Sequence, residues 1–553
     1  MKKKDLLLTI IKIIGIVILL TLSENSEVIG RYNAITYIYG YIGSITYIIL
    51  WIIFILSFIT ISFLPNLFIR MIYTIIFFLM TIIGTAYFNI SGSAITYDNF
   101  VVLIDNLNYS GDAISQYQNN ILIAILIAIS SFTFLLPVPK INIFLNKYNK
   151  YFYILPLIPF ILMLIITIIK NGYGIHSMPL QYRIPVLATY YGIETLRYET
   201  VIRDSIKIKP ITGEKPLDIV LIVDESVRGD FIDINGENMG ITPSLYKNQD
   251  RIINFGYSSS GANCSAESNQ ILRFGPNPEK FEETFNHNPY IWNYAQKAGY
   301  QTILIEGQAK KGTLNNKIST DELKNINTII NLNNGESRET DLNIAKKIKQ
   351  LLSSEHTKPL FIYVVKHGIH FPFDVKVPKD KRRYEIKGDA YNPKTKEDLI
   401  NSYKNAINYI IDPFFEELIT NNTFNNSVIF YTSDHGQNLK DNGLNLTHCS
   451  TRNTSIYEGL VPLIIITDDK ENKKLLEKAA IKNIDKTSHY NIFPTILNIL
   501  GYKSEVITKR HSQTIFDDLN DQQKFITGLL RVNRTGISKN NNWVDIQENK
   551  DIK

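Results

Sequence analysis

Long runs of apolar side chains dominate the first 170 residues, whereas the rest of the chain has the mixed pattern of a soluble domain. A helix needs about 20 mostly apolar residues to cross a bilayer. The pattern therefore predicts a transmembrane domain, residues 1–170, with five spans at 5–22, 44–64, 68–90, 119–137 and 152–170. The first run lacks a small-residue cleavage site and four more runs follow it, so we interpret it as a retained anchor rather than a signal peptide.

Charged residues between these runs predict how the helices are oriented. Basic residues gather on one side of the membrane, at Lys2, Lys3, Lys4, Arg70, Lys140, Lys147 and Lys150. The opposite loop, residues 91–118, has no Lys or Arg and contains Asp98, Asp105 and Asp112. Because basic loops stay on the cytoplasmic side, we expect a cytoplasmic N-terminus and, after five spans, an external C-terminal half.

Residues 171–214 connect the two halves and mix aromatic side chains with scattered charges. This composition predicts helices that lie along the membrane surface, with Tyr and Arg side chains at the level of the headgroups. A plain covalent linker is the alternative. We expect a catalytic domain at 215–510 and a C-terminal tail at 511–553, in which no motif suggests a role.

From residue 215 onward, short β-branched runs alternate with helical patterns. This alternation predicts an α/β domain with a central, mostly parallel sheet and helices on both faces. Strands are expected at 218–223, 301–305, 360–365, 427–432 and 461–466. Helices are expected at 289–298, 340–352, 397–420 and 488–500. Ligands in such folds bind at the carboxyl ends of the strands, and the polar motifs of this chain follow those ends.

Composition and charge limit the number of domains and the kinds of partner. The chain has 553 residues, enough for more than one domain. Its formal net charge of +6 is too mild to suggest a nucleic-acid partner. The two cysteines, Cys264 and Cys449, do not define a disulfide framework. One bridge between them and two small buried side chains both remain open.

Two of the apolar runs end abruptly in acidic residues: DIVLIVDESVRGD (218–230) and SVIFYTSDHGQNLKDNGL (427–444). The first places Glu225 at the end of a strand, and the second places Asp434 and His435 at the end of another. Carboxylate oxygens and imidazole nitrogens are ligands suited to a divalent metal. The sequence therefore predicts a metal site, and the alternative role of Glu225 is a carboxylate at a helix start.

The segment SSSGANCSAESNQILR (258–273) runs from small residues into a helical pattern. Ser265 falls in the first turn of that helix, where backbone N–H groups and the helix dipole favour negative charge. An oxygen nucleophile bound to a metal at this place would ionise near neutral pH. The alternative is that Ser265 is only an N-cap residue.

Further basic side chains follow other strands. FIYVVKHGIHFPF (361–373) contains His367 and His370, either of which is placed to hold a phosphate or to protonate a leaving group. His448 lies in a polar loop ahead of the last predicted strand. Lys311 follows the strand QTILIE, where a cation can bind phosphate. The alternatives are structural roles for the histidines and a solvated position for Lys311.

Taken together, these motifs resemble those of the phosphoethanolamine transferases that modify lipopolysaccharide, a family of the alkaline-phosphatase/sulfatase superfamily. DESVRGD resembles the family's G-E-T-x-R-x-D, SDHGQNLKDNGL its S-D-H-G-E-S-L-G-E-N-G, GIHFPF its G-S-H-G-P and LTHCS its L-H-G. INSYKNAINYIID (400–412), SHYNIFPTILNIL (488–500) and KKG (310–312) are similar to further blocks of the family. The resemblance covers nearly the whole chain.

The resemblance implies transfer of phosphoethanolamine from phosphatidylethanolamine to lipid A or to a core sugar of lipopolysaccharide. A covalent intermediate would form on Ser265. The resemblance also implies a monomeric multi-pass protein of the bacterial inner membrane with a periplasmic catalytic domain. The acceptor group itself, whether a lipid A phosphate, Kdo, heptose or another glycan, is left open.

The same resemblance assigns roles to individual residues. One tightly bound zinc ion would be held by Glu225, Asp434, His435 and the Ser265 oxygen, and a second zinc during turnover is left open. The phosphoryl oxygens of the substrate would be held by His370, His448 and Lys311.

The chain departs from the family at the nucleophile, which is a Thr in T-A-x-S-x-P. The best match is Ser265 in SAES, and Cys264, one residue earlier, is the alternative nucleophile. A sulfatase-type cysteine requires C-x-P-x-R, whereas the chain has CSAES. The family's several disulfides are also absent, which leaves the sub-family open.

Two other functions fit parts of the sequence. Glycerol-phosphate transfer from phosphatidylglycerol, as in lipoteichoic-acid-type synthases of the same superfamily, suits Glu225 and Ser226 equally well. The SDHG block and the region of His448 favour the ethanolamine donor. A non-enzymatic membrane sensor built on a decayed hydrolase domain is supported only by the altered nucleophile segment.

Overall fold

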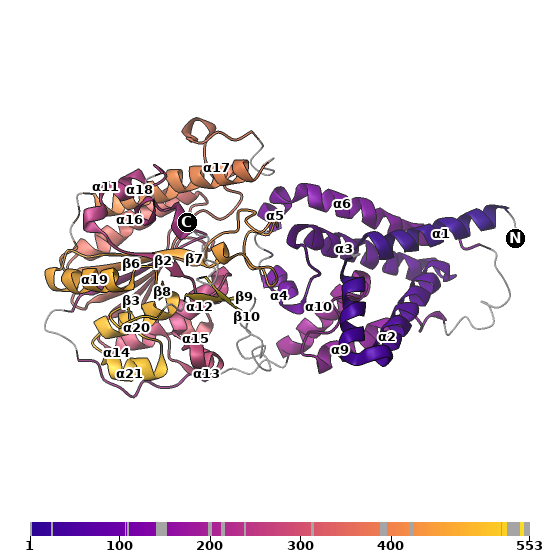
Figure 1. Cartoon of the computed structure of the whole chain (residues 1–553), viewed down its shortest axis with the longest axis horizontal. Coiled ribbons are helices and arrows are strands. Elements are labelled where there is room, and N and C mark those ends of the chain that lie inside the picture. Colours follow the sequence, from indigo (N-terminus) through magenta and orange to yellow (C-terminus); the bar gives the residue numbers. More distant parts are fainter. Residues whose placement is uncertain are drawn as a thin grey trace. The chain divides into compact units, whose positions relative to one another are not determined.

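The structure is a computed structural model of the whole chain (Figure 1). It describes residues 3–23, 26–105, 107, 110–139, 152–196, 202–211, 216–236, 239–310, 315–387, 395–420, 422, 424–520, 523–527 and 542–546. The chain divides into two compact units, Met1–Tyr198 and Glu199–Lys553.

The first unit is built from apolar helices. Among its described residues, four helical stretches are long and apolar enough to cross a membrane, and they coincide with the first four predicted spans. They are Lys3–Leu22 (α1), Gly40–Phe63 in α2 (Ser26–Phe63), Leu67–Ser91 (α3), and Gln118–Leu135, which comprises α6 (Gln118–Ala128) and η2 (Ile129–Leu135). Two shorter helices, α4 (Tyr97–Asp105) and α5 (Ser110–Gln116), lie between α3 and α6 in the chain.

A fifth apolar helix, α9 (Leu157–Ile169), is 13 residues long. That is shorter than the roughly 20 residues that a spanning helix needs. Residues 140–151, which precede it in the chain, lie outside the described part. A fifth crossing at 152–170 therefore stays a prediction.

Two cations inside this unit bind the ends of helices. Lys12 is fully buried, and its Nζ donates to the carbonyl of Ser62 at 2.7 Å. Arg70 Nη1 donates to the carbonyls of Phe134 and Leu136, each at 2.7 Å. These carbonyls lie at the C-terminal ends of α2 and η2, where a helix dipole favours positive charge. Arg70, used above to predict orientation, is thus a buried partner of a helix end.

Helix α10 (Leu180–Leu196) occupies part of the region predicted to lie along the membrane surface. It packs against α3 and α9 within the first unit. It buries Glu194, whose carboxylate accepts hydrogen bonds from the hydroxyls of Tyr97 at 2.6 Å and Tyr190 at 2.8 Å. Residues 202–211 form no helix. A place for α10 at headgroup level stays a prediction.

The second unit is an α/β domain around an eight-stranded sheet with the order β4-β3-β5-β1-β6-β7-β2-β8. The first five strands of this order run parallel, and β7 is antiparallel to both of its neighbours. The strands are β1 (Asp218–Asp224), β2 (Ile253–Ser259), β3 (Gln301–Glu306), β4 (Thr328–Asn331), β5 (Leu360–Val365), β6 (Ser427–Ser433), β7 (Leu460–Ile466) and β8 (Thr487–Ser488). The five predicted strands are confirmed as β1, β3, β5, β6 and β7.

Helices cover both faces of the sheet, with α11, α16 and α18 on one face and α12, α14 and α20 on the other (Figure 1). The helices are α11 (Pro243–Lys247), α12 (Ser265–Phe274), α13 (Phe281–His287), α14 (Ile291–Lys297), α15 (Thr320–Leu323), α16 (Ser337–Ser353), α17 (Lys396–Ala406), α18 (Asp412–Ile419), α19 (Lys470–Asn483), α20 (His489–Ile499) and α21 (Ser504–Arg510). The four predicted helical patterns correspond to α14, α16, α17 with α18, and α20. A π-helical turn, η9 (Ile407–Ile411), joins α17 to α18.

The core lies along the central strands. Every residue of β1, β5 and β6 is buried, because helices cover a parallel sheet on both faces. From α14, the Trp292 ring packs against Phe361 and Tyr363 of β5, with ring centroids 5.5 and 5.6 Å apart. This packed core supports the paired strands β1 and β6, whose carboxyl ends are in register.

The described part of the predicted C-terminal tail contains two strands, β9 (Lys524–Thr527) and β10 (Asn542–Asp545), which pair antiparallel. Ile526 of β9 donates its N–H to the carbonyl of Gly261 at 3.1 Å and accepts the N–H of Asn263 at 3.2 Å. Phe525 is fully buried. These strands were not predicted, because runs of four residues are too short to stand out in the sequence.

Candidate active site

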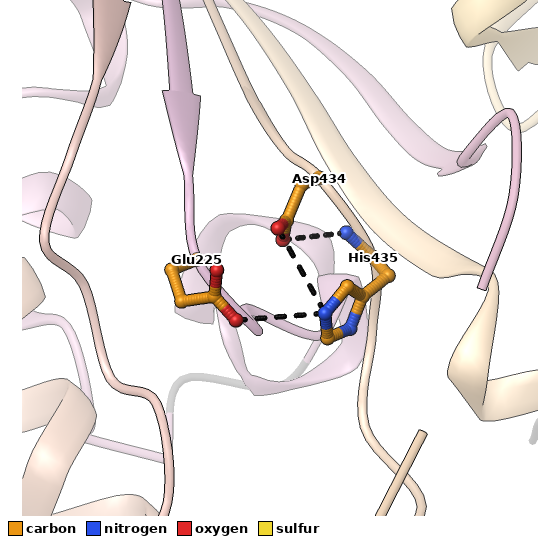
Figure 2. A group of neighbouring side chains, drawn as sticks. All are labelled: Glu225, Asp434 and His435. Atoms are coloured by element: carbon orange, nitrogen blue, oxygen red, sulfur yellow. Dashed lines mark hydrogen bonds and ion pairs between the residues drawn. The ribbon is translucent and has the colours of Figure 1, made fainter. Parts of the chain in front are cut away.

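The register of β1 and β6 brings the acidic motifs together. Asp224, the last residue of β1, pairs with Ser433, the last residue of β6. Glu225 and Asp434 therefore leave the same edge of the sheet side by side, and His435 follows (Figure 2). One ligand atom from each of Glu225, Asp434 and His435 lies within 4.8 Å of the others, and all three side chains are buried.

The donor atoms of this triad face one another. Nε2 of His435 lies 3.5 Å from Oε1 of Glu225 and 3.8 Å from Oδ2 of Asp434. Nδ1 of the same imidazole donates to the carbonyl of Gly436 at 2.6 Å, which leaves the Nε2 lone pair for the site. Oδ2 of Asp434 is buried and makes no hydrogen bond within the described part of the chain.

The triad places two buried carboxyl groups beside a single imidazole, and each group shifts the pKa of the others. Burial raises the pKa of Asp434 well above its usual value, and the charge of Glu225 adds to the rise. Burial also opposes ionisation of Glu225, but the hydrogen bond and charge of His435 hold the pKa of Glu225 well below its usual value. Burial lowers the pKa of His435, but the two carboxylates outweigh it and raise that pKa to about 9. The carboxylates thus compete for positive charge.

The triad fits a zinc ion. Two carboxylates and one imidazole are ligands that zinc accepts, and a catalytic zinc commonly has three protein ligands with a further position open. A cation would supply the partner that the buried Oδ2 of Asp434 lacks in the described structure. It would also supply the positive charge for which the carboxylates compete.

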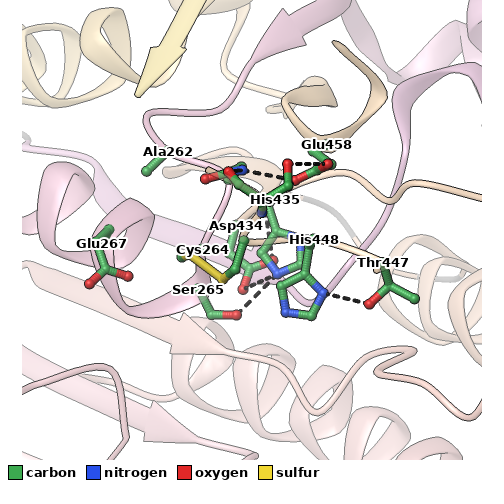
Figure 3. Close-up of a disulfide and its surroundings, with 12 residues drawn as sticks. Ala262, Cys264, Ser265, Glu267, Asp434, His435, Thr447, His448 and Glu458 are labelled. Carbon is green, nitrogen blue, oxygen red and sulfur yellow. Dashed lines mark hydrogen bonds and ion pairs between the residues drawn. A yellow bond between two sulfur atoms is a disulfide. The ribbon is translucent and has the colours of Figure 1, made fainter. Parts of the chain in front are cut away.

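Ser265 is the first residue of α12, and its side chain lies against the triad (Figure 3). Its Oγ is 3.1 Å from Nε2 of His435 and 3.4 Å from Oε2 of Glu225. At the N-terminus of a helix, free N–H groups and the dipole stabilise an anionic oxygen. The position therefore suits an ionised nucleophile that also contacts the metal ligands.

Cys264, the alternative nucleophile, forms a disulfide with Cys449 (Figure 3). The Cα atoms of the two cysteines are 4.8 Å apart. The bridge that the sequence left open is thus formed in the structure. Because its sulfur is bonded, Cys264 has no thiol with which to attack a substrate, and Ser265 is the better candidate.

Two further histidines, His448 and His370, lie near the triad. The ring of His448 stacks on that of His435, with centroids 4.3 Å apart, and the ring of His370 lies 6.0 Å from that of His448. Nδ1 of His448 bonds to the hydroxyl of Thr447 at 3.0 Å. Burial and the two neighbouring imidazoles lower the pKa of His448 well below its usual value. His448 is thus neutral at pH 7.

Two candidate side chains remain, His367 and Lys311, and the structure describes only His367. Nδ1 of His367 bonds to the hydroxyl of Ser337 on α16 at 2.7 Å, and burial lowers the pKa of His367 to about 3. Its role is therefore to tie the loop after β5 to α16, which leaves His370 as the member of the pair beside His448. Lys311 lies outside the described residues.

Gln308 contacts the triad but was not singled out from the sequence. Its Nε2 donates to Oε2 of Glu225 at 2.9 Å. Its backbone N–H donates to Oε1 of Glu306, the last residue of β3, at 2.8 Å. In the sequence, the one sign of its role was its position, two residues after the end of a strand. Gln308 orients the carboxylate of Glu225 and is the kind of hydrogen-bond partner on which metal ligands depend.

A buried ion cluster lies beneath the site and was also missed. Lys366 Nζ contacts Asp224 and lies 3.3 Å from Oδ2 of Asp341, and all three side chains are fully buried. Asp224 accepts the N–H of Glu225 at 2.9 Å, and Asp341 accepts the N–H of His367 at 2.9 Å. The cluster thus connects the strand end that carries Glu225 to the loop that leads to His370. Its members lie at two strand ends and on α16, so sequence spacing did not group them.

Comparison with known proteins places this geometry in a family. The model of the Sulfatase family matches residues 218–502, slightly more than half of the chain. The chain belongs to the sulfatase family. The matched range contains the triad, Ser265 and all the histidines of the site.

Curated relatives of this sulfatase-family protein are phosphoethanolamine transferases. It is 21% identical over 342 residues to the Kdo(2)-lipid A phosphoethanolamine 7''-transferase of Escherichia coli K12, covering 60% of this chain and 55% of that protein. It is 23% identical over 300 residues to phosphoethanolamine transferase EptA of the same strain, covering 52% of this chain and 53% of EptA. The matches thus span about half the length of these relatives.

A solved structure agrees with the fold over a longer range. The integral membrane protein lipooligosaccharide phosphoethanolamine transferase A (EptA) of Neisseria meningitidis matches with a TM-score of 0.60 and 16% sequence identity. The match covers 88% of this chain and 97% of that protein. At this identity the likeness shows the fold: apolar helices followed by a sulfatase-like α/β domain.

Proposed function

We propose that this sulfatase-family protein transfers phosphoethanolamine from phosphatidylethanolamine to lipid A or to a core sugar of lipopolysaccharide. The observation that carries the proposal is the position of Ser265. Its Oγ lies at the N-terminus of α12 and within 3.1 Å of His435 Nε2, in a chain similar to phosphoethanolamine transferases.

In the first half-reaction Ser265 is the nucleophile. Its Oγ attacks the phosphorus of phosphatidylethanolamine, the bond from phosphorus to the glycerol oxygen breaks, and diacylglycerol leaves with the proton that Ser265 gives up. The product is a phosphoethanolamine ester of Ser265. In the second half-reaction an acceptor oxygen attacks the same phosphorus, the bond to Oγ breaks, and Ser265 regains a proton.

Glu225, Asp434, His435 and the Ser265 oxygen would hold zinc at this site. Zinc, when bound, lowers the pKa of a coordinated hydroxyl group and offsets negative charge. Glu225 and the imidazole of His435 contact the serine oxygen at the N-terminus of α12, at 3.4 and 3.1 Å.

Two histidines and a lysine are proposed to bind the phosphoryl group. Nδ1 of His448 is engaged by Thr447, so Nε2 is the atom that this imidazole presents to a phosphoryl oxygen. Nδ1 of His370 is within 2.8 Å of the carbonyl of Phe371 and donates to it, which fixes the orientation of that ring. We assign Lys311 to the same role on the basis of the sequence motif.

We also propose that the protein is a monomer of the bacterial inner membrane, with its catalytic unit in the periplasm. Four span-length apolar helices support a membrane protein. The Cys264–Cys449 disulfide supports an oxidising compartment, because disulfides persist in the periplasm and are rare in the cytoplasm.

A donor comparison tests the proposed reaction. The full-length protein in detergent is incubated with phosphatidylethanolamine or phosphatidylglycerol, and released diacylglycerol is measured. Release from phosphatidylethanolamine, with little from phosphatidylglycerol and none in Ser265→Ala, supports the proposal. Preference for phosphatidylglycerol would assign glycerol-phosphate transfer instead, and equal background release in all samples would contradict a transferase.

A further inference from the structure

The loop that carries Ser265 and the loop that carries His448 are joined by a covalent bond. Cys264 directly precedes Ser265, and Cys449 directly follows His448 (Figure 3). Both site residues approach the same imidazole: Ser265 Oγ lies 3.1 Å from His435 Nε2, and the ring of His448 stacks on that of His435 at 4.3 Å. The bond therefore links the nucleophile to a neighbouring phosphate-binding candidate over 185 residues of sequence.

Hydrogen bonds reinforce this link on its N-terminal side. Cys449 donates its N–H to the carbonyl of Asn263 at 2.9 Å. The side-chain Nδ2 of Asn263 donates in turn to the carbonyl of Ser450 at 2.9 Å. The residues before Ser265 and those after His448 therefore lie side by side, held by one disulfide and two hydrogen bonds.

The carboxylate of Glu458 binds both loops at once. It is fully buried, and Oε2 accepts from Asn263 Nδ2 at 2.8 Å and from the N–H of Ser450 at 3.1 Å. Oε1 accepts from the Ser450 hydroxyl at 2.6 Å and from the N–H of Ser455 at 3.3 Å. One carboxylate thus satisfies donors from the nucleophile loop, from the His448 loop and from the start of η10 (Ile456–Glu458).

The backbone at Glu458 also binds the loop that follows His435. Its carbonyl accepts the N–H of Gly436, the residue after His435, at 2.9 Å. The neighbouring carbonyl of Tyr457 accepts the N–H of Gln437, also at 2.9 Å. Glu458 is therefore connected to the loops of Ser265, His448 and His435 without contacting the ligand atoms of the triad.

We propose that Glu458 and the Cys264–Cys449 disulfide act together as positioning residues that hold the Ser265 and His448 loops in register at the catalytic centre. This inference rests on the proposed function, in which Ser265 is the nucleophile. We call Glu458, Asn263 and the Cys264–Cys449 bond the clamp.

The clamp and the triad depend on different parts of the fold. Glu225 and Asp434 are held by the paired ends of β1 and β6, whereas the clamp holds loops. Loss of the clamp should therefore slow the attack of Ser265 and leave metal binding in place. A displacement of about 1 Å in a reacting group can cost on the order of 100-fold in rate.

The test compares five full-length proteins: wild type, Glu458→Gln, the double variant Cys264→Ala/Cys449→Ala, the triple variant that combines these changes, and the control Asp412→Asn. Asp412 is also a buried carboxylate that accepts backbone N–H groups, those of Ser244 and Leu245, but it lies outside the site. Bound zinc, thermal unfolding, the donor KM and the single-turnover rate of phosphoethanolamine attachment to the protein are measured for each.

The clamp predicts that Glu458→Gln and the double cysteine variant attach phosphoethanolamine about 10- to 100-fold more slowly, with zinc content and donor KM unchanged. Combining the two changes should cost less than the product of their separate effects, because both break the same link. Wild-type rates in both variants, or slow rates accompanied by an equal loss of zinc, would overturn the inference.

A second readout needs no lipid. Hydrogen exchange followed by mass spectrometry should be faster in residues 260–268 and 446–452 of both clamp variants, and unchanged in β1 and β6. Unchanged exchange in these loops would overturn the inference even if the rates fell. If wild type forms no adduct with phosphatidylethanolamine, the proposed function fails, whereas the exchange comparison still decides whether the clamp holds the loops.

Discussion

Ser265 Oγ and His435 Nε2 lie 3.1 Å apart although 170 residues separate them in the chain. The contact exists because α12 begins where β6 ends, so that a helix N-terminus meets a strand's carboxyl edge. It joins the candidate nucleophile to the candidate metal ligands. The proposed function depends on this contact more than on any other.

Removal of one triad carboxylate should weaken zinc binding. Asp434→Asn replaces a buried carboxyl group whose Oδ2 has no hydrogen-bond partner within the described structure. Loss even of a hydrogen-bond partner of a metal ligand costs about 10- to 100-fold in affinity, so we expect at least the upper end of that range. Competition with a zinc chelator measures it. Affinity equal to that of wild type would contradict the assignment of Asp434.

Lys366→Met should destabilise the second unit strongly. The change leaves the buried carboxylates of Asp224 and Asp341 without their cation. Breaking a buried pair in this way costs roughly 3–5 kcal/mol. Denaturant unfolding of the full-length protein measures the loss. The matched control is Lys324→Met at an exposed pair with Asp321, where we expect a change below about 1 kcal/mol.

The C-terminal strands should be part of the folded domain. Phe525 is fully buried beside Leu460 and Ile546, so Phe525→Ala leaves a cavity there. A buried Phe→Ala change typically costs about 3–5 kcal/mol. Thermal unfolding with and without the change measures it. An unaltered unfolding temperature would show that β9 is dispensable, contrary to its pairing with the segment before Ser265.

Glu458 should give stability a defined pH dependence. Burial raises the pKa of Glu458 to about 7, and its hydrogen-bond donors Asn263, Ser450 and Ser455 are neutral. The folded state therefore binds this proton more tightly than the unfolded state. The contribution is fully present below the unfolded pKa of about 4.3 and is lost as pH rises through about 7.

The comparison that isolates this effect uses Glu458→Gln, which does not titrate. Between pH 4.5 and 7.5, the free energy of unfolding of wild type should fall relative to that of the variant, by on the order of 3 kcal/mol. Parallel pH profiles for the two proteins would contradict a raised pKa at this position.

The central strands and the triad could be predicted because each is marked by a short continuous stretch of sequence. Glu225, Asp434 and His435 follow immediately after long apolar runs, and a parallel sheet necessarily gathers strand ends at one edge. The four long apolar helices were predictable for the same reason, since length and composition decide them.

Other features depend on contacts that spacing does not encode. The network of Lys366, Asp224 and Asp341 joins two strand ends and a helix. Gln308 resembles any other loop amide until the fold places it beside Glu225. The pairing of Cys264 with Cys449 could be named from the sequence but not decided, because two cysteines alone do not show that their loops meet.

In the proposed reaction, Ser265 receives phosphoethanolamine from phosphatidylethanolamine. Intact-protein mass spectrometry after incubation with this lipid tests it most directly, on wild type, Ser265→Ala and Ser265→Thr. We expect a phosphoethanolamine adduct on wild type and on Ser265→Thr, which keeps a hydroxyl at the same place, and none on Ser265→Ala. An adduct of undiminished yield on Ser265→Ala would contradict the account.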